Sequence, residues 1–281
     1  MKLKYGIKTN CIDITSVCFE QLYSNGVITI PAKNENCDAI FGDPIFGIKK
    51  KIFKTDDDDT ILEEFDDLHP IKVYVQEISN IIDQIYNSMT INYGKMETEK
   101  KMHIVCANNL LGNEKILEIG GNIGRTSLLI AYILNKYNVD NNLNNQLNLV
   151  TMECDINIAN KLEENRNNNN FNFYIEKSAL SNKEICETNN TITYDQLKNK
   201  YSINFDTLII DCDGTFYNIL YDIPEILDGI KLIIMKNDYD TLNKKIYIDN
   251  KLLQYNFETI FSQRGGWGAC CNNFYEVWKK K

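Results

Sequence analysis

The sequence predicts an α/β fold with a mainly parallel sheet, preceded by a small β module and a helical connector. From Lys115 onward, short apolar runs alternate with longer segments whose apolar residues recur every three or four positions. This alternation is typical of parallel strands covered by helices on both faces of one sheet. Before Lys115 the chain has short β-like runs and then a helical pattern, so the two parts differ in architecture.

Residues 1–55 are expected to form the small β module. Its β-like runs are separated by Gly, Pro and Asn, and they span residues 11–19, 26–32 and 47–53. The acidic stretch at 55–68 lacks the glycine and the ligand spacing of a calcium loop, so we expect a solvated linker there. Apolar residues with helical spacing run from 70 to 111, which makes 56–112 an acidic linker followed by a helical connector.

Residues 113–281 are expected to form the α/β domain. The predicted buried strands are 115–120, 148–154, 172–180, 205–212 and 230–237. The predicted helices that follow them are 123–134, 156–167, 193–201, 217–227 and 239–255. The last two runs, 257–265 and 272–280, have no helix between them, so they should pair antiparallel and complete seven strands. Asparagine-rich stretches at 138–148 and 165–172 are expected in surface loops and at helix ends.

The composition narrows the classes of partner. The chain has 281 residues, 43% of them hydrophobic, and no apolar run approaches the roughly 18 residues that a membrane span needs. The N-terminal segment lacks the apolar stretch of a signal peptide. Nine cysteines form no CxxC pair, so we expect free thiols in a reducing, cytoplasmic compartment and no zinc site. A net charge of −9 disfavours nucleic acid, and we expect neither a nucleic-acid nor a membrane partner.

A glycine turn follows the first predicted strand of the α/β domain. Its pattern is ExGxNxG, from Glu118 through Gly120 and Asn122 to Gly124. A nicotinamide-binding turn has a glycine where Asn122 stands, so a closely bound diphosphate is disfavoured. Glu118 suits a cationic amine, and Glu153 at the end of the next strand suits a ribose. Together they fit a nucleoside that carries an amino acid, S-adenosylmethionine; an ordinary tight turn with Glu118 capping the helix stays the alternative.

Several segments together resemble the FkbM-type methyltransferases. They are "KILEIGGNIGRTSLLIAYIL", "LVTMECDINIANKLEENRNNNNFNFYIEKSALS", "TYDQLKNKYSINFDTLIIDCDGTFYNIL", "IKLIIMKNDY" and "GGWGACCNNFYEVWKK", which occur in the family's order over about residues 95–281. The resemblance implies the Rossmann-like seven-stranded methyltransferase sheet, with its last strand antiparallel, and S-adenosylmethionine as cofactor. Members of this family are often linked to O-methylation of sugars, so a sugar or glycan hydroxyl is the expected acceptor. "IDIT", "IPA" and "FGDPIFGI" are similar to a small β module of carbohydrate-modifying proteins.

The resemblance also implies where the cofactor would lie. The methionine end would be lined by Glu118, Gly120, Asn122 and Gly124, with Gly121 in the same turn. By the same resemblance, Glu153 would hold the ribose, and Ser178 and Ala179 would lie beside the adenine. Asp211 would face the transferred methyl group.

Two positions depart from the family pattern. The fourth strand usually ends in DxEG, and here it ends in DCDG with Asp213. The fifth strand commonly ends in an acidic residue, and here Lys236 stands in its place. Because adjacent strands lie about 4.8 Å apart, Lys236 is expected to pair with Asp211 or Asp213. A cation at this point leaves a second interpretation open, a catalytically weak binding module for a glycan or a protein partner.

Carboxylates are the expected proton acceptors. Both histidines, His69 and His103, precede the α/β domain, so the catalytic candidates are Asp211, Asp213, Asp238 and Lys236, with Tyr239 behind them. Mg²⁺ prefers oxygen ligands, but Lys236 argues against a metal among the aspartates, and none is predicted. Tyr217, Trp267 and Tyr275 are candidates for stacking on a sugar or for ordinary core packing. A nicotinamide oxidoreductase is a third interpretation, which the glycine pattern disfavours.

Overall fold

The chain divides into two compact units in the computed structural model. The structure describes residues 2–24, 27–56, 58–74, 76–143, 147–182, 190–266 and 268–281. The first unit is Met1–Asn80 with Ile260–Ser262, and the second is Ile81–Thr259 with Gln263–Lys281. The sequence placed the end of the β module at residue 55, so the first unit is longer than expected.

The first unit contains two antiparallel sheets. Its elements are β1 (Lys2–Ile7), β2 (Asn10–Asp13), α1 (Thr15–Val17), a π-helical turn (Cys18–Leu22), β3 (Tyr23–Ser24), β4 (Val27–Ile30), α2 (Asn34–Phe41), β5 (Lys51–Thr55), β6 (Ile61–Phe65) and β7 (Ile71–Tyr74). The sheets have the orders β2-β1-β5-β6 and β3-β4-β7. Apolar side chains from both sheets, among them Leu3, Ile28, Ile52 and Val73, form one buried core.

Two expectations for this part of the chain are wrong. The acidic stretch contains β6, which pairs antiparallel with β5, where a solvated linker was expected. Its acidic residues belong to the sheet because Lys51 binds Glu64 and Lys54 binds Glu63 across the two strands, at 2.5 and 2.9 Å. The helical pattern predicted from residue 70 begins with a strand, β7, and the first helix of the connector starts only at Gln76.

The second unit alternates strands and helices as the sequence predicts. Its helices are α3 (Gln76–Asn87, which begins before the unit boundary), α4 (Lys100–Asn109), α5 (Arg125–Asp140), α6 (Ile156–Asn168), α7 (Tyr194–Tyr201), α8 (Phe216–Asp222) and α9 (Leu242–Gln254), with 3₁₀ turns at Met96–Glu99, Pro224–Leu227 and Cys271–Asn273. Its strands are β8 (Ile116–Ile119), β9 (Leu149–Met152), β10 (Tyr174–Glu176), β11 (Ala179–Leu180), β12 (Thr191–Ile192), β13 (Thr207–Ile210), β14 (Leu232–Lys236), β15 (Phe257–Gln263) and β16 (Tyr275–Lys280).

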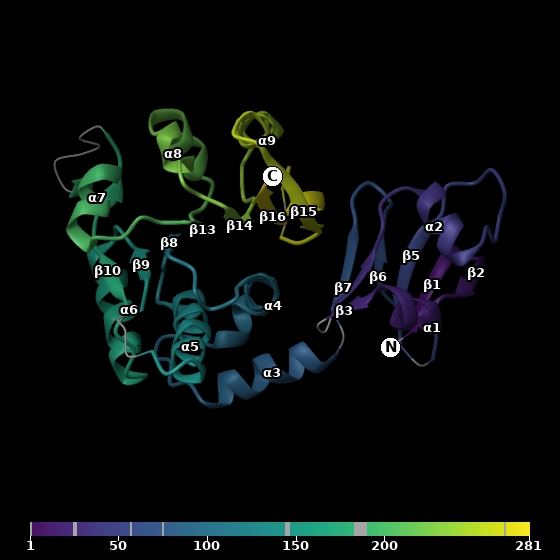
Figure 1. The fold of residues 1–281 in the computed structure, drawn as a ribbon, viewed down its shortest axis with the longest axis horizontal. Helices are drawn as coiled ribbons and strands as arrows, with labels where there is room; N and C mark the ends of the chain where they lie inside the picture. Colours follow the sequence, from purple (N-terminus) through teal and green to yellow (C-terminus); the bar gives the residue numbers. More distant parts are fainter. Residues whose placement is uncertain are drawn as a thin grey trace. The chain divides into compact units, whose positions relative to one another are not determined.

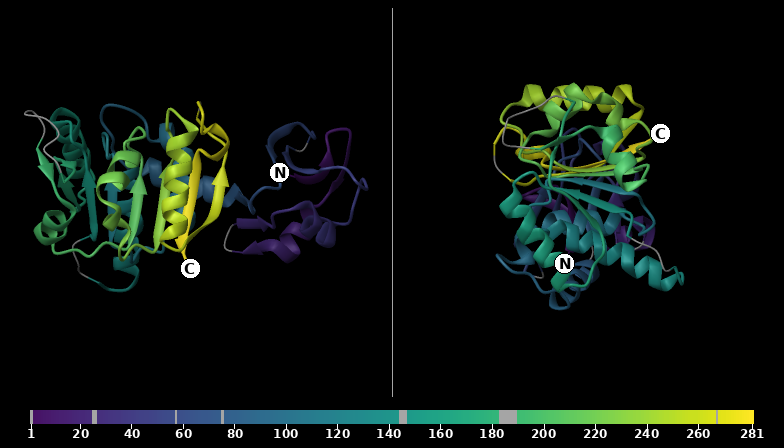
Figure 2. Two further views of the ribbon diagram at one scale, coloured as in Figure 1. Left: turned by 90° about the horizontal axis from the view of Figure 1, so that it is seen from above. Right: turned by 90° about the vertical axis from the view of Figure 1, so that its left-hand side faces the viewer.

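Seven of these strands form one sheet in the order β10-β9-β8-β13-β14-β16-β15. The strands from β10 to β14 are parallel, and β16 runs antiparallel to β14. In Figures 1 and 2, α4 and α5 lie on one face of this sheet and α8 and α9 on the other. The order and the strand directions confirm the predicted Rossmann-like seven-stranded sheet with an antiparallel last strand.

The central strands of the sheet are buried on both faces, which explains why they are nearly continuous apolar runs in the sequence. Every residue of β8, β9 and β13 is buried. Parallel strands place their carboxyl ends at one edge, and the order reverses between β8 and β13, so a crevice is expected there. Within the described residues, no helix combines the length and the apolar character that crossing a membrane requires.

Candidate cofactor and active site

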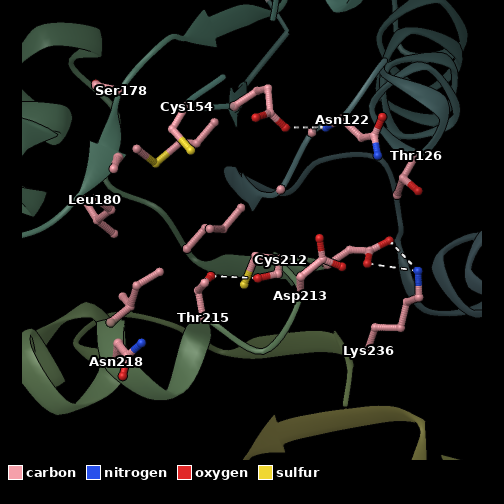
Figure 3. A pocket seen from close by; sticks show the side chains of 18 of the residues that line it. Asn122, Thr126, Cys154, Ser178, Leu180, Cys212, Asp213, Thr215, Asn218 and Lys236 are labelled. Atoms are coloured by element: carbon pink, nitrogen blue, oxygen red, sulfur yellow. Dashed lines mark hydrogen bonds and ion pairs between the residues drawn. The ribbon is translucent and has the colours of Figure 1, made fainter. Parts of the chain in front are cut away.

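A cavity of about 590 Å³ opens at the carboxyl ends of β8, β9 and β13. Side chains and backbone from the glycine turn, from the segments after β9 and β10, and from the DCDG turn after β13 line it (Figure 3). Seven of the nine predicted cofactor residues line this cavity: Gly120, Gly121, Asn122, Glu153, Ser178, Ala179 and Asp211. The crevice at the reversal of strand order is therefore the candidate site.

The glycine turn is shaped by the close approach of two strand ends. Gly120 has a φ of +94°, and a Cβ there would lie 1.8 Å from the carbonyl oxygen of Asp211. Its requirement for glycine thus comes from the neighbouring chain segment. Gly124 also has a positive φ, of +95°, and it begins α5 without lining the cavity.

Glu153 is fixed by the turn that faces it. Its carboxylate accepts hydrogen bonds from the backbone N–H groups of Asn122, at 2.9 Å, and Asp155, at 3.0 Å. Each oxygen accepts only one of these bonds, so lone pairs remain for hydroxyl donors from a ligand. Asn122 adopts a φ of +47° and accepts a hydrogen bond from the N–H of Ile123 on its own side chain, at 2.7 Å.

Glu118 does not line the cavity. Its side chain is fully buried between strands, where Thr151 on β9 donates a hydrogen bond to Oε2 at 2.7 Å. Burial raises the pKa of Glu118 to about 7, although the nearby hydroxyl groups of Ser127 and Thr151 act to lower it. Strand alternation turns this carboxylate into the domain interior, so the structure does not support the expected contact with a cationic amine, and it does not cap α5 either.

The opposite end of the cavity is formed by the segment after β10. Ser178 donates a 2.5 Å hydrogen bond to Glu176, a buried carboxylate that also binds Lys200 and Tyr201, at 2.8 and 3.0 Å. The backbone of Ala179 pairs with β12. These contacts hold the Ser178–Ala179 edge against the cavity, on the side that carries Leu180 and Asn218 in Figure 3.

Lys236 joins two carboxylates at the other end. Its Nζ lies 2.9 Å from Asp211 Oδ1, 3.0 Å from Asp211 Oδ2 and 3.2 Å from Glu99 Oε2. This confirms the predicted pairing of Lys236 with the end of the fourth strand. Burial raises the pKa of Asp211 to about 6, while Lys236 counteracts that rise. The ammonium is half-buried, and although burial opposes it, Asp211 and Glu99 hold the pKa of Lys236 above its usual value.

The other two aspartates have different surroundings. The carboxylate of Asp238 accepts a 2.7 Å hydrogen bond from the N–H of Gly214 and is absent from the cavity lining. Asp213 is exposed, lines the cavity and has a φ of +49°. Among the described residues, no hydrogen bond or ion pair engages the carboxylate of Asp213. Asp238 therefore shapes the DCDG turn, and Asp213 faces the cavity.

Sequence reasoning missed several residues of this site. Glu99 comes from a 3₁₀ turn before α4, 137 positions away from Lys236, so neither periodicity nor spacing could indicate it. Arg125 and Thr126, which begin α5, and the exposed thiol of Cys154 also line the cavity. Arg125 and Cys154 had a signal in the sequence, since they directly follow the predicted Gly124 and Glu153.

The two aromatic candidates that the structure describes, Tyr217 and Tyr275, do not line the cavity. Tyr217 packs against Tyr221 and Tyr247, outside the cavity lining. Tyr275 is buried and pairs in the sheet with Lys236, and Trp267 lies outside the described residues. His103 is fully buried against Tyr86, and burial lowers its pKa to about 3. In the described part of the chain, no three His, Cys, Asp or Glu side chains are placed to hold a metal ion.

Comparison with known proteins gives distant structural likenesses only. No family model and no curated protein matches the chain. Ribosomal protein L11 methylase from Lactobacillus delbrueckii subsp. bulgaricus is 12% identical, with a TM-score of 0.46 over 68% of this chain and 82% of that chain. An O-methyltransferase from Bacillus cereus in complex with SAH is 14% identical, with a TM-score of 0.45 over 74% and 92%.

A putative tRNA (m1A22) methyltransferase from Streptococcus pneumoniae, in complex with S-adenosyl-L-methionine, is 11% identical, with a TM-score of 0.39 over 64% of this chain and 72% of that chain. The chain is similar to these proteins in the arrangement of strands and helices. Likeness this distant does not assign a family, a cofactor or a reaction, and membership of the FkbM-type family stays a prediction.

Proposed function

We propose that the second unit is an S-adenosylmethionine-dependent methyltransferase that O-methylates a sugar or glycan hydroxyl. The observation that carries the proposal is the composition of a single cavity, in which Glu153, the Ser178–Ala179 edge and Asp211 meet at the reversal of strand order. Glu153 offers a carboxylate to ribose hydroxyls, and the Ser178–Ala179 edge can lie beside a base. The charged end of the cavity, at Asp211, suits the amino-acid tail of such a nucleoside. The acceptor class rests on the resemblance alone.

The residues present fit this cofactor. The carboxylate of Glu153 keeps lone pairs directed to hydroxyl donors, and the side chains of Met152 and Ile219 add apolar surface toward a base. Gly120 and Gly121 line the cavity with backbone alone, because a Cβ at either position would collide with neighbouring protein atoms. When bound, S-adenosylmethionine supplies a methyl group on a positively charged sulfur, which is a strong electrophile.

Asp213 is the proposed proton acceptor. It faces the cavity, and its carboxylate has no partner among the described residues, so it is available to a hydroxyl. Lys236 occupies both oxygens of Asp211, which makes Asp211 a poorer base and leaves it an orienting role. Asp238 holds the N–H of Gly214 and so fixes the backbone that presents Asp213.

The Lys236–Asp211 pair also favours a second candidate function, a binding module with little turnover. An ammonium stands where an acidic residue is expected by resemblance, and it neutralises the carboxylate nearest the expected methyl group. In that case the cavity would bind the cofactor without efficient transfer to an acceptor.

Two measurements separate these functions. Calorimetry with S-adenosylhomocysteine and with NAD tests the cofactor, and we expect binding of the first only. Single-turnover methyl transfer to a panel of neutral sugars, with and without Mg²⁺, then tests the enzyme. We expect Asp213→Asn to lower the rate about 100-fold, which is the usual contribution of a general base, with unchanged cofactor affinity.

The Lys236→Glu variant decides between enzyme and module. A faster rate in this variant, or a new dependence on Mg²⁺, would support the module. A wild-type chain that is already fast, and slower as the variant, would show that Lys236 assists transfer. Binding of NAD with no affinity for S-adenosylhomocysteine would refute both functions.

A further inference from the structure

We propose that Glu99 and Arg125 form the site for the zwitterionic amino-acid end of the nucleoside ligand, Glu99 for its ammonium and Arg125 for its carboxylate. This rests on the proposed function and changes its assignment of residues, because the glycine-turn pattern assigned the amine to Glu118. Glu118 is fully buried and outside the cavity lining, whereas Glu99 and Arg125 both line it.

The two residues lie at the correct end of the cavity. In Figure 3, Ser178 and Leu180 lie at one end, and Thr126 and Lys236 lie at the other. Thr126 directly follows Arg125, and Lys236 binds Glu99. A nucleoside with its base at the Ser178 end therefore extends its tail toward Glu99 and Arg125.

Glu99 has one carboxylate oxygen to offer. Its Oε2 lies 3.2 Å from Lys236 Nζ, and no hydrogen bond or ion pair among the described residues engages Oε1. The ammonium of Lys236 is shared with both oxygens of Asp211, at 2.9 and 3.0 Å. Glu99 is thus only partly neutralised by Lys236, and it can accept a hydrogen bond from a second ammonium.

Arg125 supplies the opposite charge. Its Nε donates a 3.0 Å hydrogen bond to the carbonyl of Lys95, and within the described part of the chain it has no carboxylate within ion-pair distance. Its terminal nitrogens remain as donors in a planar fork, which matches a carboxylate in geometry. A cation and an anion from separate elements, both facing one cavity end, are complementary to an α-amino acid.

Hydrogen bonds to helix α6 hold the segment before Glu99 and the turn before Arg125 in place. We call residues 89–99 the strap; it runs over α6 to the turn that carries Glu99. Asn165, fully buried on α6, accepts the N–H of Asn92 at 2.7 Å and donates to the carbonyls of Asn92, at 3.2 Å, and Ile123, at 2.8 Å. The same asparagine thus ties the strap to the glycine turn shortly before Arg125.

The test compares two ligands that differ only at the tail. S-adenosylhomocysteine carries the amino acid, and 5′-deoxy-5′-methylthioadenosine has the same base, ribose and sulfur without it. We expect calorimetry on the full chain to show that Glu99→Gln and Arg125→Gln each weaken S-adenosylhomocysteine about tenfold or more, since each removes a charge-assisted hydrogen bond. Neither change should alter the affinity for methylthioadenosine.

The matched control is Glu97→Gln. Glu97 lies on the same 3₁₀ turn but is exposed and outside the cavity lining, so this variant should bind both ligands as the wild type does.

Three results would overturn the assignment: equal affinity of the wild type for the two ligands, a loss in Glu99→Gln that is the same for both, or a loss in Glu97→Gln as large as that in Glu99→Gln. Failure of the wild type to bind either nucleoside has a different meaning, because it would refute the proposed function itself and the assignment with it.

Discussion

Three glutamates of the second unit show how surroundings decide the role of one side chain. Glu153 is half-buried and held by backbone N–H groups, so it is available to a ligand. Glu99 lines the same cavity beside a lysine. Glu118 stands in a fully buried strand, where its carboxylate accepts a hydrogen bond from Thr151. A buried carboxylate with a raised pKa stabilises a domain in acid and weakens it above that pKa.

We therefore predict that Glu118→Gln stabilises the chain at pH 8 and has little effect near pH 4.5. The pKa of Glu118 is raised from 4.5 to about 7 in the folded chain. Its favourable contribution is complete below the unfolded value and is lost as the pH rises through about 7. The free energy of unfolding at pH 8 should rise by roughly 3 kcal/mol, by the usual conversion of a pKa shift.

Urea unfolding at pH 5 and pH 8 measures this effect, with the exposed Glu97→Gln as a control. Asp211, with its pKa raised to about 6 by burial, keeps some pH dependence in every variant. An equal difference between the two pH values in wild type and Glu118→Gln would show that Glu118 is not the titrating group.

At the scale of elements, α6 and the strap are joined by side chains from a stretch that composition alone marks as low in complexity. Asn169 accepts the N–H of Thr90 at 2.8 Å and donates to its carbonyl at 2.6 Å, and Asn165 does the same for Asn92. Two amide side chains therefore replace two backbone partners, much as a neighbouring strand would. The expected surface location is wrong for Asn165, which is fully buried.

We predict that each asparagine protects one backbone amide. Asn165→Ala should speed hydrogen exchange at Asn92, and Asn169→Ala should speed it at Thr90, because each variant removes the acceptor of that N–H. Asn165→Ala should also lower the free energy of unfolding by about 2 kcal/mol, since it leaves buried backbone groups unpaired.

Exchange followed by NMR or mass spectrometry measures the protection. Asn168→Ala is the control, because Asn168 is exposed on the same helix and its side chain makes no hydrogen bond within the described residues. Unchanged exchange at both amides in both variants would mean that the strap does not depend on the asparagines.

At the scale of the whole molecule, the sequence predicted the second unit well and the first unit poorly. Strands buried on both faces are continuous apolar runs, so β8, β9 and β13 stand out. β6 was not predicted, because Glu63 and Glu64 interrupt its apolar pattern. The partners of these two residues, Lys54 and Lys51, lie in another strand. Glu99 was not predicted either, because its partner, Lys236, is 137 positions away in the sequence.

Every residue that lines the cavity belongs to the second unit. We propose that this unit folds and binds its ligand independently of the first. A chain that begins at Gln76, the start of α3, should bind S-adenosylhomocysteine within about twofold of the full chain, because a compact domain keeps its own core.

Calorimetry and circular dichroism of this truncated chain test the independence of the two units. The full chain in the same buffer is the reference. Loss of helical signal would show that the second unit needs residues 1–75 to fold, and a folded fragment without affinity would place part of the binding energy in the first unit.

The exposed thiol of Cys154 allows a probe to be attached covalently at the cavity. It directly follows Glu153 and lines the cavity, and burial and the neighbouring carboxylate raise its pKa, so alkylation is best carried out in mild alkali. An environment-sensitive dye attached there would report a bound nucleoside as a change in emission. A library of nucleosides and acceptors could then be screened by fluorescence before any reaction product is identified.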